Sequence, residues 1–148
     1  MKDKDLRLVI VFMIFPIFFY GQIINKKISF DSGKTRVVIE DDIKGEEIID
    51  YAVNVKKGDS VSIILKRKIN SSYFNLLPPK SDNVADFIGQ TQGDTCKMTL
   101  SQNGIYKIRV YQMRSSARRG THVKFSLDIS LFTTIGIDSE KKTITNKY

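Results

Sequence analysis

Three arginines fall within six positions near the C-terminal end of this 148-residue sequence. Arg114, Arg118 and Arg119 belong to the segment QMRSSARRG, residues 112–120. A guanidinium group is planar and always charged, and it can bind a carboxylate or a phosphate through two parallel hydrogen bonds. A loop that carries such groups between two strands is therefore suited to gripping an anionic partner. The alternative is a solvated turn whose charge aids solubility, and composition alone leaves both interpretations open.

The segments on either side of the arginines alternate between apolar and polar residues, as half-buried strands do. Residues 105–113 predict one strand, with Tyr106, Ile108 and Val110 on the core face and Lys107, Arg109 and Tyr111 facing outward. Residues 122–131 predict the most regular strand, whose core face carries Val123, Phe125, Leu127, Ile129 and Leu131. The arginine segment is thus expected to be held at both ends by core strands.

Further strands of the same period are predicted upstream, and no helical periodicity is evident. They cover residues 35–43, 46–55, 60–68, 72–77 and 96–100. Good turn residues separate several of them, and Pro78-Pro79 ends the strand at 72–77. Residues 80–95 are interpreted as a long loop. Strand 96–100 is predicted to form a hairpin with 105–113 through the Ser-Gln-Asn-Gly turn.

This pattern predicts an all-β fold in one domain, an antiparallel β-sandwich of about eight strands. Residues 22–131 are assigned to the sandwich, and residues 132–148 to a C-terminal extension or an added edge strand. Residues 1–21 read as a signal peptide: basic residues precede thirteen uncharged ones, and Gly21 suits cleavage. That stretch is too short to span a bilayer easily and contains Pro16. A periplasmic or secreted protein, outside the membrane after cleavage, is therefore expected.

The composition argues against several other functions. The net charge of +8 raises nucleic acid as a partner, but the positive residues are scattered and the aromatic ones mostly take inward positions. Nucleic acid is therefore not predicted as a partner. His122 is the single histidine, so a multi-histidine metal site or a histidine-based enzyme is not predicted, nor is a cofactor. Cys96 is the single cysteine and is expected to be a buried thiol.

Two acidic runs, Glu40-Asp41-Asp42 and Glu46-Glu47, could supply a carboxylate pair for glycoside or calcium chemistry. They lack the alternating-oxygen spacing of a dedicated calcium loop, and they flank a turn. The solvated end of a hairpin is the preferred interpretation, and an enzyme is not predicted.

The stretch from Asn103 to Leu131 contains N-G-I-Y-x-I-R-V-x-Q-x-R-x-x-A-R followed by K-F-S-L-D-I-S-L. It resembles the C-terminal half of the bacterial periplasmic inhibitors of goose-type lysozyme. In that family a Ser-Gly-x-Tyr strand start, an Arg-Val-x-Gln-x-Arg-x-x-Ala-Arg run and a final alternating strand occur in this order. Asn103 departs from the family pattern, which has serine there. Upstream, Asp50-Tyr51 and the segment 55–59 also resemble the family, so the resemblance spans roughly residues 35–131.

The resemblance implies an inhibitor that physically blocks a lysozyme. Arg114 and Arg118 match the arginines that the family presents towards the lysozyme cleft, and Tyr51 matches a tyrosine of the binding surface. Tyr51 shares the parity of Ile49 and Val53, so a core tyrosine with its hydroxyl at the rim is an equal alternative. Further candidate contacts are Ser115, Ser116, Arg119, Asn103 and Gly104.

The sequence therefore predicts an inhibitor of goose-type lysozyme, with invertebrate-type lysozyme as a possible target. A guanidinium group would pair with the catalytic carboxylates of the enzyme. The rival hypothesis is a non-catalytic secreted β-sandwich module that binds glycan or peptidoglycan, with exposed aromatic residues such as Tyr111 on its binding face.

Overall fold

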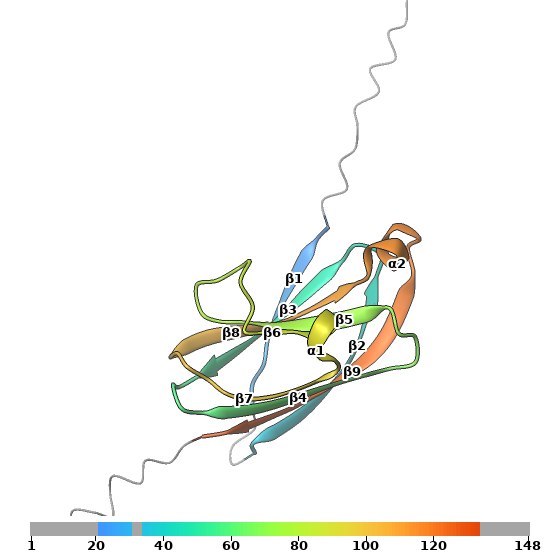
Figure 1. Ribbon diagram of the computed structural model, residues 1–148. Coiled ribbons are helices and arrows are strands. Elements are labelled where there is room, and N and C mark those ends of the chain that lie inside the picture. The colour runs from blue at the N-terminus through green and yellow to red at the C-terminus, as the bar shows by residue number, and fades with distance from the viewer. Residues whose placement is uncertain (1–20, 31–33, 134–148) are drawn as a thin grey trace, which may run out of the picture.

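In the computed structural model, which describes residues 21–30 and 34–133, the chain forms two β-sheets packed face to face (Figure 1). The five-stranded sheet has the order β1-β3-β8-β5-β6, and the four-stranded sheet has the order β2-β9-β4-β7. The first comprises β1 (Ile23–Lys27), β3 (Ile48–Val55), β8 (Gly104–Gln112), β5 (Ser72–Leu77) and β6 (Phe87–Ile88). The second comprises β2 (Arg36–Lys44), β9 (His122–Phe132), β4 (Ser60–Arg67) and β7 (Thr95–Thr99). The predicted β-sandwich is confirmed.

The core lies between the sheets and is made of the residues that alternation placed inward. Tyr106, Ile108 and Val110 of β8 are buried. They face the predicted set from β9, of which Val123, Phe125, Leu127 and Ile129 are also buried. Cys96 is buried as expected, and burial raises the pKa of its thiol to about 11. The two sheets are therefore held together mainly by the burial of apolar side chains between them.

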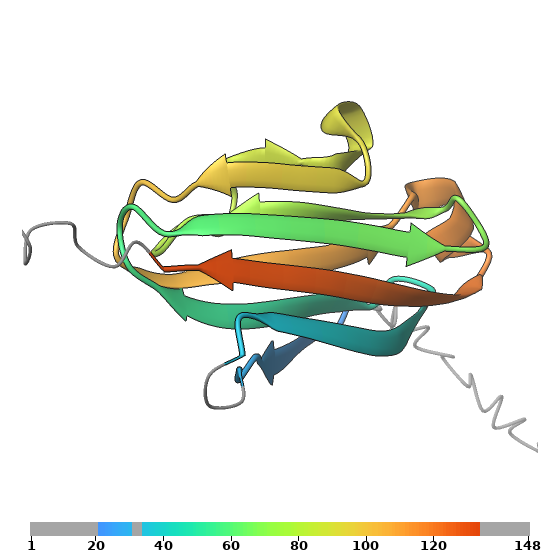
Figure 2. The ribbon, with the colours of Figure 1, turned by 90° about the horizontal axis from the view of Figure 1, so that it is seen from below.

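Strand pairing differs from the prediction at two turns. Strand β7 pairs with β4 in the four-stranded sheet, while β8 pairs with β3 and β5 in the other sheet. The predicted hairpin of 96–100 with 105–113 is thus wrong. The acidic runs do not end a hairpin either, since β2 pairs with β9 and β3 lies in the opposite sheet. Figure 2 shows these connections passing from one layer to the other.

Four elements of the structure were not predicted from the sequence. Strand β1 runs parallel to β3 at the edge of its sheet, with Ile23 beside Ile48. Within the predicted loop 80–95 lie β6 and the short helix α1 (Gly89–Gln92). Gly89 fits because a Cβ there would lie 2.4 Å from the Phe74 carbonyl oxygen. The fourth element, helix α2 (Arg114–Arg118), replaces the loop expected at the arginine segment.

Neither short helix in the described part of the chain has the length and apolarity needed to cross a membrane. The predicted signal peptide and the predicted C-terminal extension fall almost entirely outside the described residues.

Candidate functional site

Helix α2 is a single turn at one end of the sandwich, between β8 and β9 (Figure 1). The backbone N–H groups of Ser116 and Ala117 both donate to the Met113 carbonyl, each at 2.9 Å. Arg114, Ser115, Arg118 and Arg119 are exposed, whereas Ser116 is buried. The turn therefore directs its cationic side chains outward, while Ser116 packs inward.

Gln112 anchors the helix to the rest of the sandwich. It takes the inward position after Val110 and is 6% exposed. Its side-chain amide donates to the carbonyl oxygens of Thr121 at 2.8 Å, Gly45 at 3.2 Å and Ile43 at 3.4 Å. Two backbone bonds add to this, from Met113 N–H to Ser71 O and from Gly45 N–H to Thr121 O. One buried amide thus joins the chain before α2, the chain after it and the β2–β3 turn.

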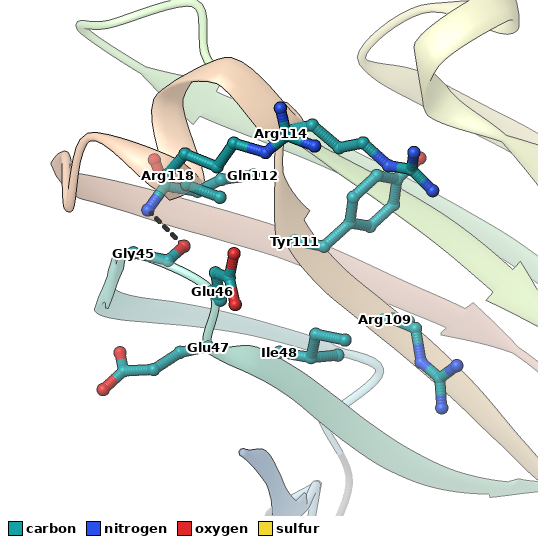
Figure 3. Close-up of a pocket in the computed structure, with 10 residues that line it drawn as sticks. Gly45, Glu46, Glu47, Ile48, Arg109, Tyr111, Gln112, Arg114 and Arg118 are labelled. Atoms are coloured by element: carbon teal, nitrogen blue, oxygen red, sulfur yellow. Dashed lines mark hydrogen bonds between the residues drawn. The ribbon is translucent and has the colours of Figure 1, made fainter. Parts of the chain in front are cut away.

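A shallow cleft of about 270 Å³ opens between α2 and the β2–β3 turn (Figure 3). Arg114 and Arg118 extend along its upper side, with the Arg114 side chain reaching toward the ring of Tyr111. Glu46 and Glu47 lie on the opposite side, and Glu47 accepts the Lys44 N–H at 2.9 Å. The remaining lining residues are Gly45, Ile48, Arg109, Gln112 and Ala117.

The two arginines of α2, Arg114 and Arg118, differ in their electrostatic surroundings from Arg36, Arg67 and Arg109. Among residues 21–30 and 34–133, neither the Arg114 nor the Arg118 side chain has an acidic partner or a hydrogen bond. Arg109, by contrast, makes a bidentate pair with the buried Asp50, both bonds being 2.7 Å. Arg36 makes a similar bidentate pair with Asp128, and Arg67 forms an ion pair with Asp94 at 2.7 Å. The charges of α2 are thus free to bind an external anion.

Tyr51 is placed in the core, 1% exposed, at the edge between the two sheets. Its hydroxyl donates to Asp41 at 2.5 Å, and Asp41 also accepts a bond from Lys26. Burial and then the Asp41 carboxylate raise the pKa of Tyr51. Burial alone would raise the pKa of Asp41, but the bonds from Lys26 and Tyr51 outweigh it and lower that pKa. This three-residue cluster is satisfied by its own members.

Asn103 and Gly104 lie at the other end of β8 from α2. At roughly 3.3 Å per residue, the nine residues of this strand separate Gly104 from Gln112 by roughly 25 Å. The Asn103 side chain accepts the Lys57 N–H at 2.8 Å, and Gly104 has a φ of +128°. These two candidates occupy a turn remote from the arginine cleft. The structure therefore brings together only the candidates from 114 to 119.

Sequence reasoning missed the anchoring role of Gln112 and the acidic side of the cleft. The first had a signal, because Gln112 is a polar residue at an inward position of a strand. The second had none, because the position of Glu46 and Glu47 beside α2 follows from strand pairing that the alternation does not specify.

Comparison with solved structures places this geometry among known proteins. The chain is similar to the crystal structure of Aeromonas hydrophila PliG, a periplasmic lysozyme inhibitor of g-type lysozyme. The TM-score is 0.68 and the identity 25%, covering 76% of this chain and 99% of that one. Salmonella Typhimurium PliG, described in the same terms, gives 0.59 and 26%, covering 73% and 97%. A mutant of the Escherichia coli PliG shares the fold at 24% identity, with a TM-score of 0.58 over 76% and 99% of the chains.

No model of a protein family and no curated protein matches the sequence. The resemblance to periplasmic inhibitors of g-type lysozyme, inferred from residue patterns, is confirmed by the solved structures.

Proposed function

We propose that this protein is a periplasmic or secreted inhibitor of lysozyme, with goose-type lysozyme as its target. The two PliG proteins above are periplasmic inhibitors of g-type lysozyme, and this chain shares their fold along almost their whole length. In this proposal the protein has no catalytic activity of its own and needs no cofactor. It acts by occupying the groove in which the enzyme binds peptidoglycan.

The observation that carries the proposal is the pair of free arginines on α2. A guanidinium group already paired with a neighbouring acid has little to offer a partner, whereas Arg114 and Arg118 are exposed and have no partner in the described part of the chain. Gln112 and the backbone bonds around it fix the turn before binding. Such preorganisation reduces the entropy lost when the complex forms.

The mechanism is physical blockade. Glycoside hydrolases cleave their substrates with a pair of carboxyl groups, which in a lysozyme lie at the base of a groove. Helix α2, inserted into this groove, would fill sugar-binding positions. A guanidinium group of Arg114 or Arg118 would then pair with a catalytic carboxylate as water is excluded. Ser115 lies exposed between them and is suited to hydrogen bonds at the rim of that contact.

Charge over longer distances works against the complex if the target is itself basic, because this chain carries +8. Glu46 and Glu47 stand beside the arginines and provide local negative charge on the other side of the cleft. In the proposed complex they would attract basic side chains of such a target at short range, and this attraction would offset the repulsion between the whole molecules.

The test is a lysis assay with purified protein and a panel of goose-, invertebrate- and hen-type lysozymes acting on cell walls. Stoichiometric protein should slow lysis by the goose-type enzyme most. Unchanged lysis by every enzyme with the protein in excess, together with its sedimentation on isolated peptidoglycan, would instead identify the glycan-binding module.

A further inference from the structure

The outer face of the five-stranded sheet carries an apolar row directly beside α2. Strand register places Ile23 next to Ile48, and Tyr73 next to Tyr111. Ile49 is paired with Val110 on the antiparallel strands β3 and β8. Ile48 precedes Ile49 and Tyr111 follows Val110, so Ile48 and Tyr111 lie opposite each other. The row therefore crosses four neighbouring strands, β1, β3, β8 and β5, and none of its members points into the core.

The neighbouring row on the same face is polar, and its side chains are hydrogen-bonded within the chain. Asp50 and Arg109 form the bidentate pair described above, and Asn75 accepts the Tyr111 hydroxyl at 3.2 Å. The apolar row is thus bounded on one side by saturated polar groups and on the other by free arginines. The row is exposed at Ile23 and half-buried at its other members. An apolar strip that contains tyrosines and has a cationic border resembles the centre of a protein interface, where aromatic residues and Arg are enriched.

Tyr111 is the member of the row best placed to act as an anchor. Its ring lines the arginine cleft and lies 6.2 Å from the Tyr73 ring, tilted by 45°. Its hydroxyl is held by Asn75, and burial raises its pKa, so it stays protonated at neutral pH. Because the ring is already fixed, it loses little conformational freedom on binding. Tyr51, by contrast, is buried with its hydroxyl held by Asp41 and has no surface to offer.

We propose that the apolar row formed by Ile23, Ile48, Tyr111 and Tyr73 is the second half of the lysozyme-binding surface, with Tyr111 as its aromatic anchor in place of Tyr51. This inference rests on the proposed function and names the rest of the contact. The occupant is the wall of the lysozyme groove beside the catalytic carboxylates. The apolar row is continuous with the arginine-bearing turn: α2 begins three residues after Tyr111, and Arg114 reaches toward the Tyr111 ring (Figure 3).

The experiment measures inhibition of the goose-type lysozyme by wild type, Arg114→Ala, Tyr111→Ala and the matched control Ile105→Ala. Ile105 is on the same face of the same strand, 55% exposed, at the end remote from α2. Tyr111→Ala should raise the concentration for half-inhibition at least tenfold, and Ile105→Ala should leave it within twofold. The tenfold loss should be similar at low and high salt, because the lost contact is apolar, whereas the loss in Arg114→Ala should depend on salt.

Thermal unfolding of each variant separates lost contact from lost fold. If Tyr111→Ala proves unstable, Tyr111→Leu keeps apolar packing against Tyr73 but removes the flat ring, and it should show a loss in the same direction. Inhibition by a folded Tyr111 variant that equals wild type, while Arg114→Ala fails to inhibit, would overturn the apolar row and leave the proposed function standing. Absence of inhibition by wild type would instead remove the proposed function itself.

Discussion

The two ends of strand β8 carry polar groups in opposite conditions. At the Gly104 end, the Asn103 side chain is bound by the Lys57 backbone, and the Gly58 and Leu100 backbones bond to one another across the same turn. At the Gln112 end, the anchoring bonds are also satisfied, but Arg114 and Arg118 beyond them are not. The polar groups at the Gly104 end are hydrogen-bonded within the fold, whereas the arginines beyond the Gln112 end are available to bind a partner.

The difference shows how to separate structural charges from binding charges in a basic protein. Arg36, Arg67 and Arg109 each have a carboxylate within hydrogen-bond distance, so their charge is used within the chain. Only where a rigid backbone holds a cation away from the chain's own acids is the cation available for a partner. In the described residues, α2 meets that condition.

The largest expected effect comes from removing a free arginine. Arg114→Ala should weaken inhibition of lysozyme by about 2 to 5 kcal/mol, roughly 30-fold or more in affinity, because it leaves a desolvated enzyme carboxylate unpaired. Its matched control is Arg36→Ala, which removes the same charge from the four-stranded sheet, where Arg36 already pairs with Asp128. Inhibition constants measured by lysis should change less than threefold for Arg36→Ala. Equal losses in both variants would mean that net charge, and not α2, governs binding.

The second effect concerns the anchor beneath the arginines. Gln112→Leu keeps the side-chain volume but removes the donor to three carbonyl groups, so it should lower the free energy of unfolding by about 2 kcal/mol. Inhibition should also fall, because α2 is no longer fixed before binding. Denaturant unfolding and the lysis assay measure the two effects. Gln102→Leu, at an exposed glutamine of the far turn, is the control and should alter neither.

The third effect tests a saturated polar cluster. The pKa of Asp41 is lowered in the fold, so the ionised carboxylate stabilises the protein above its unfolded pKa of about 3.9, and this stabilisation is lost as pH falls through the lower folded value. Asp41→Asn should therefore cost about 1 kcal/mol at pH 7, from the weakened bonds to Lys26 and Tyr51. The difference from wild type should shrink below about pH 4. Unfolding curves that differ by the same amount at pH 7 and pH 3 would contradict this account.

The sequence predicts which side chains of a strand face the core, because this depends only on the strand itself. Side chains alternate along any strand, so the apolar positions of β8 and β9 identify their inward faces whatever strands lie beside them. The arginine segment was identified for a similar reason, since three cations between two regular strands stand out in the sequence itself. The physical state of those cations, exposed and unpaired, required the structure.

The sequence does not show which strands lie side by side, and the two wrong hairpin predictions follow from that. A four-residue connection such as 100–103 fits a hairpin as well as a crossing between sheets, and the alternation of β7 and β8 is the same in both cases. The apolar row across β1, β3, β8 and β5 depends on register between segments far apart in the sequence. Strand β1 itself has little alternation, so the sequence does not predict its pairing with β3.

The smallest expected effect comes from the closed end of β8. Resemblance put Asn103 among the candidate contacts, but the strand carries it roughly 25 Å from α2. Asn103→Ala should cost well under 1 kcal/mol of stability, because its bond to the Lys57 N–H is exposed to water. Inhibition should stay within twofold of wild type in the same lysis assay. A large loss of inhibition in Asn103→Ala would contradict this expectation. It would mean that lysozyme contacts the whole length of β8 and not only the end at α2.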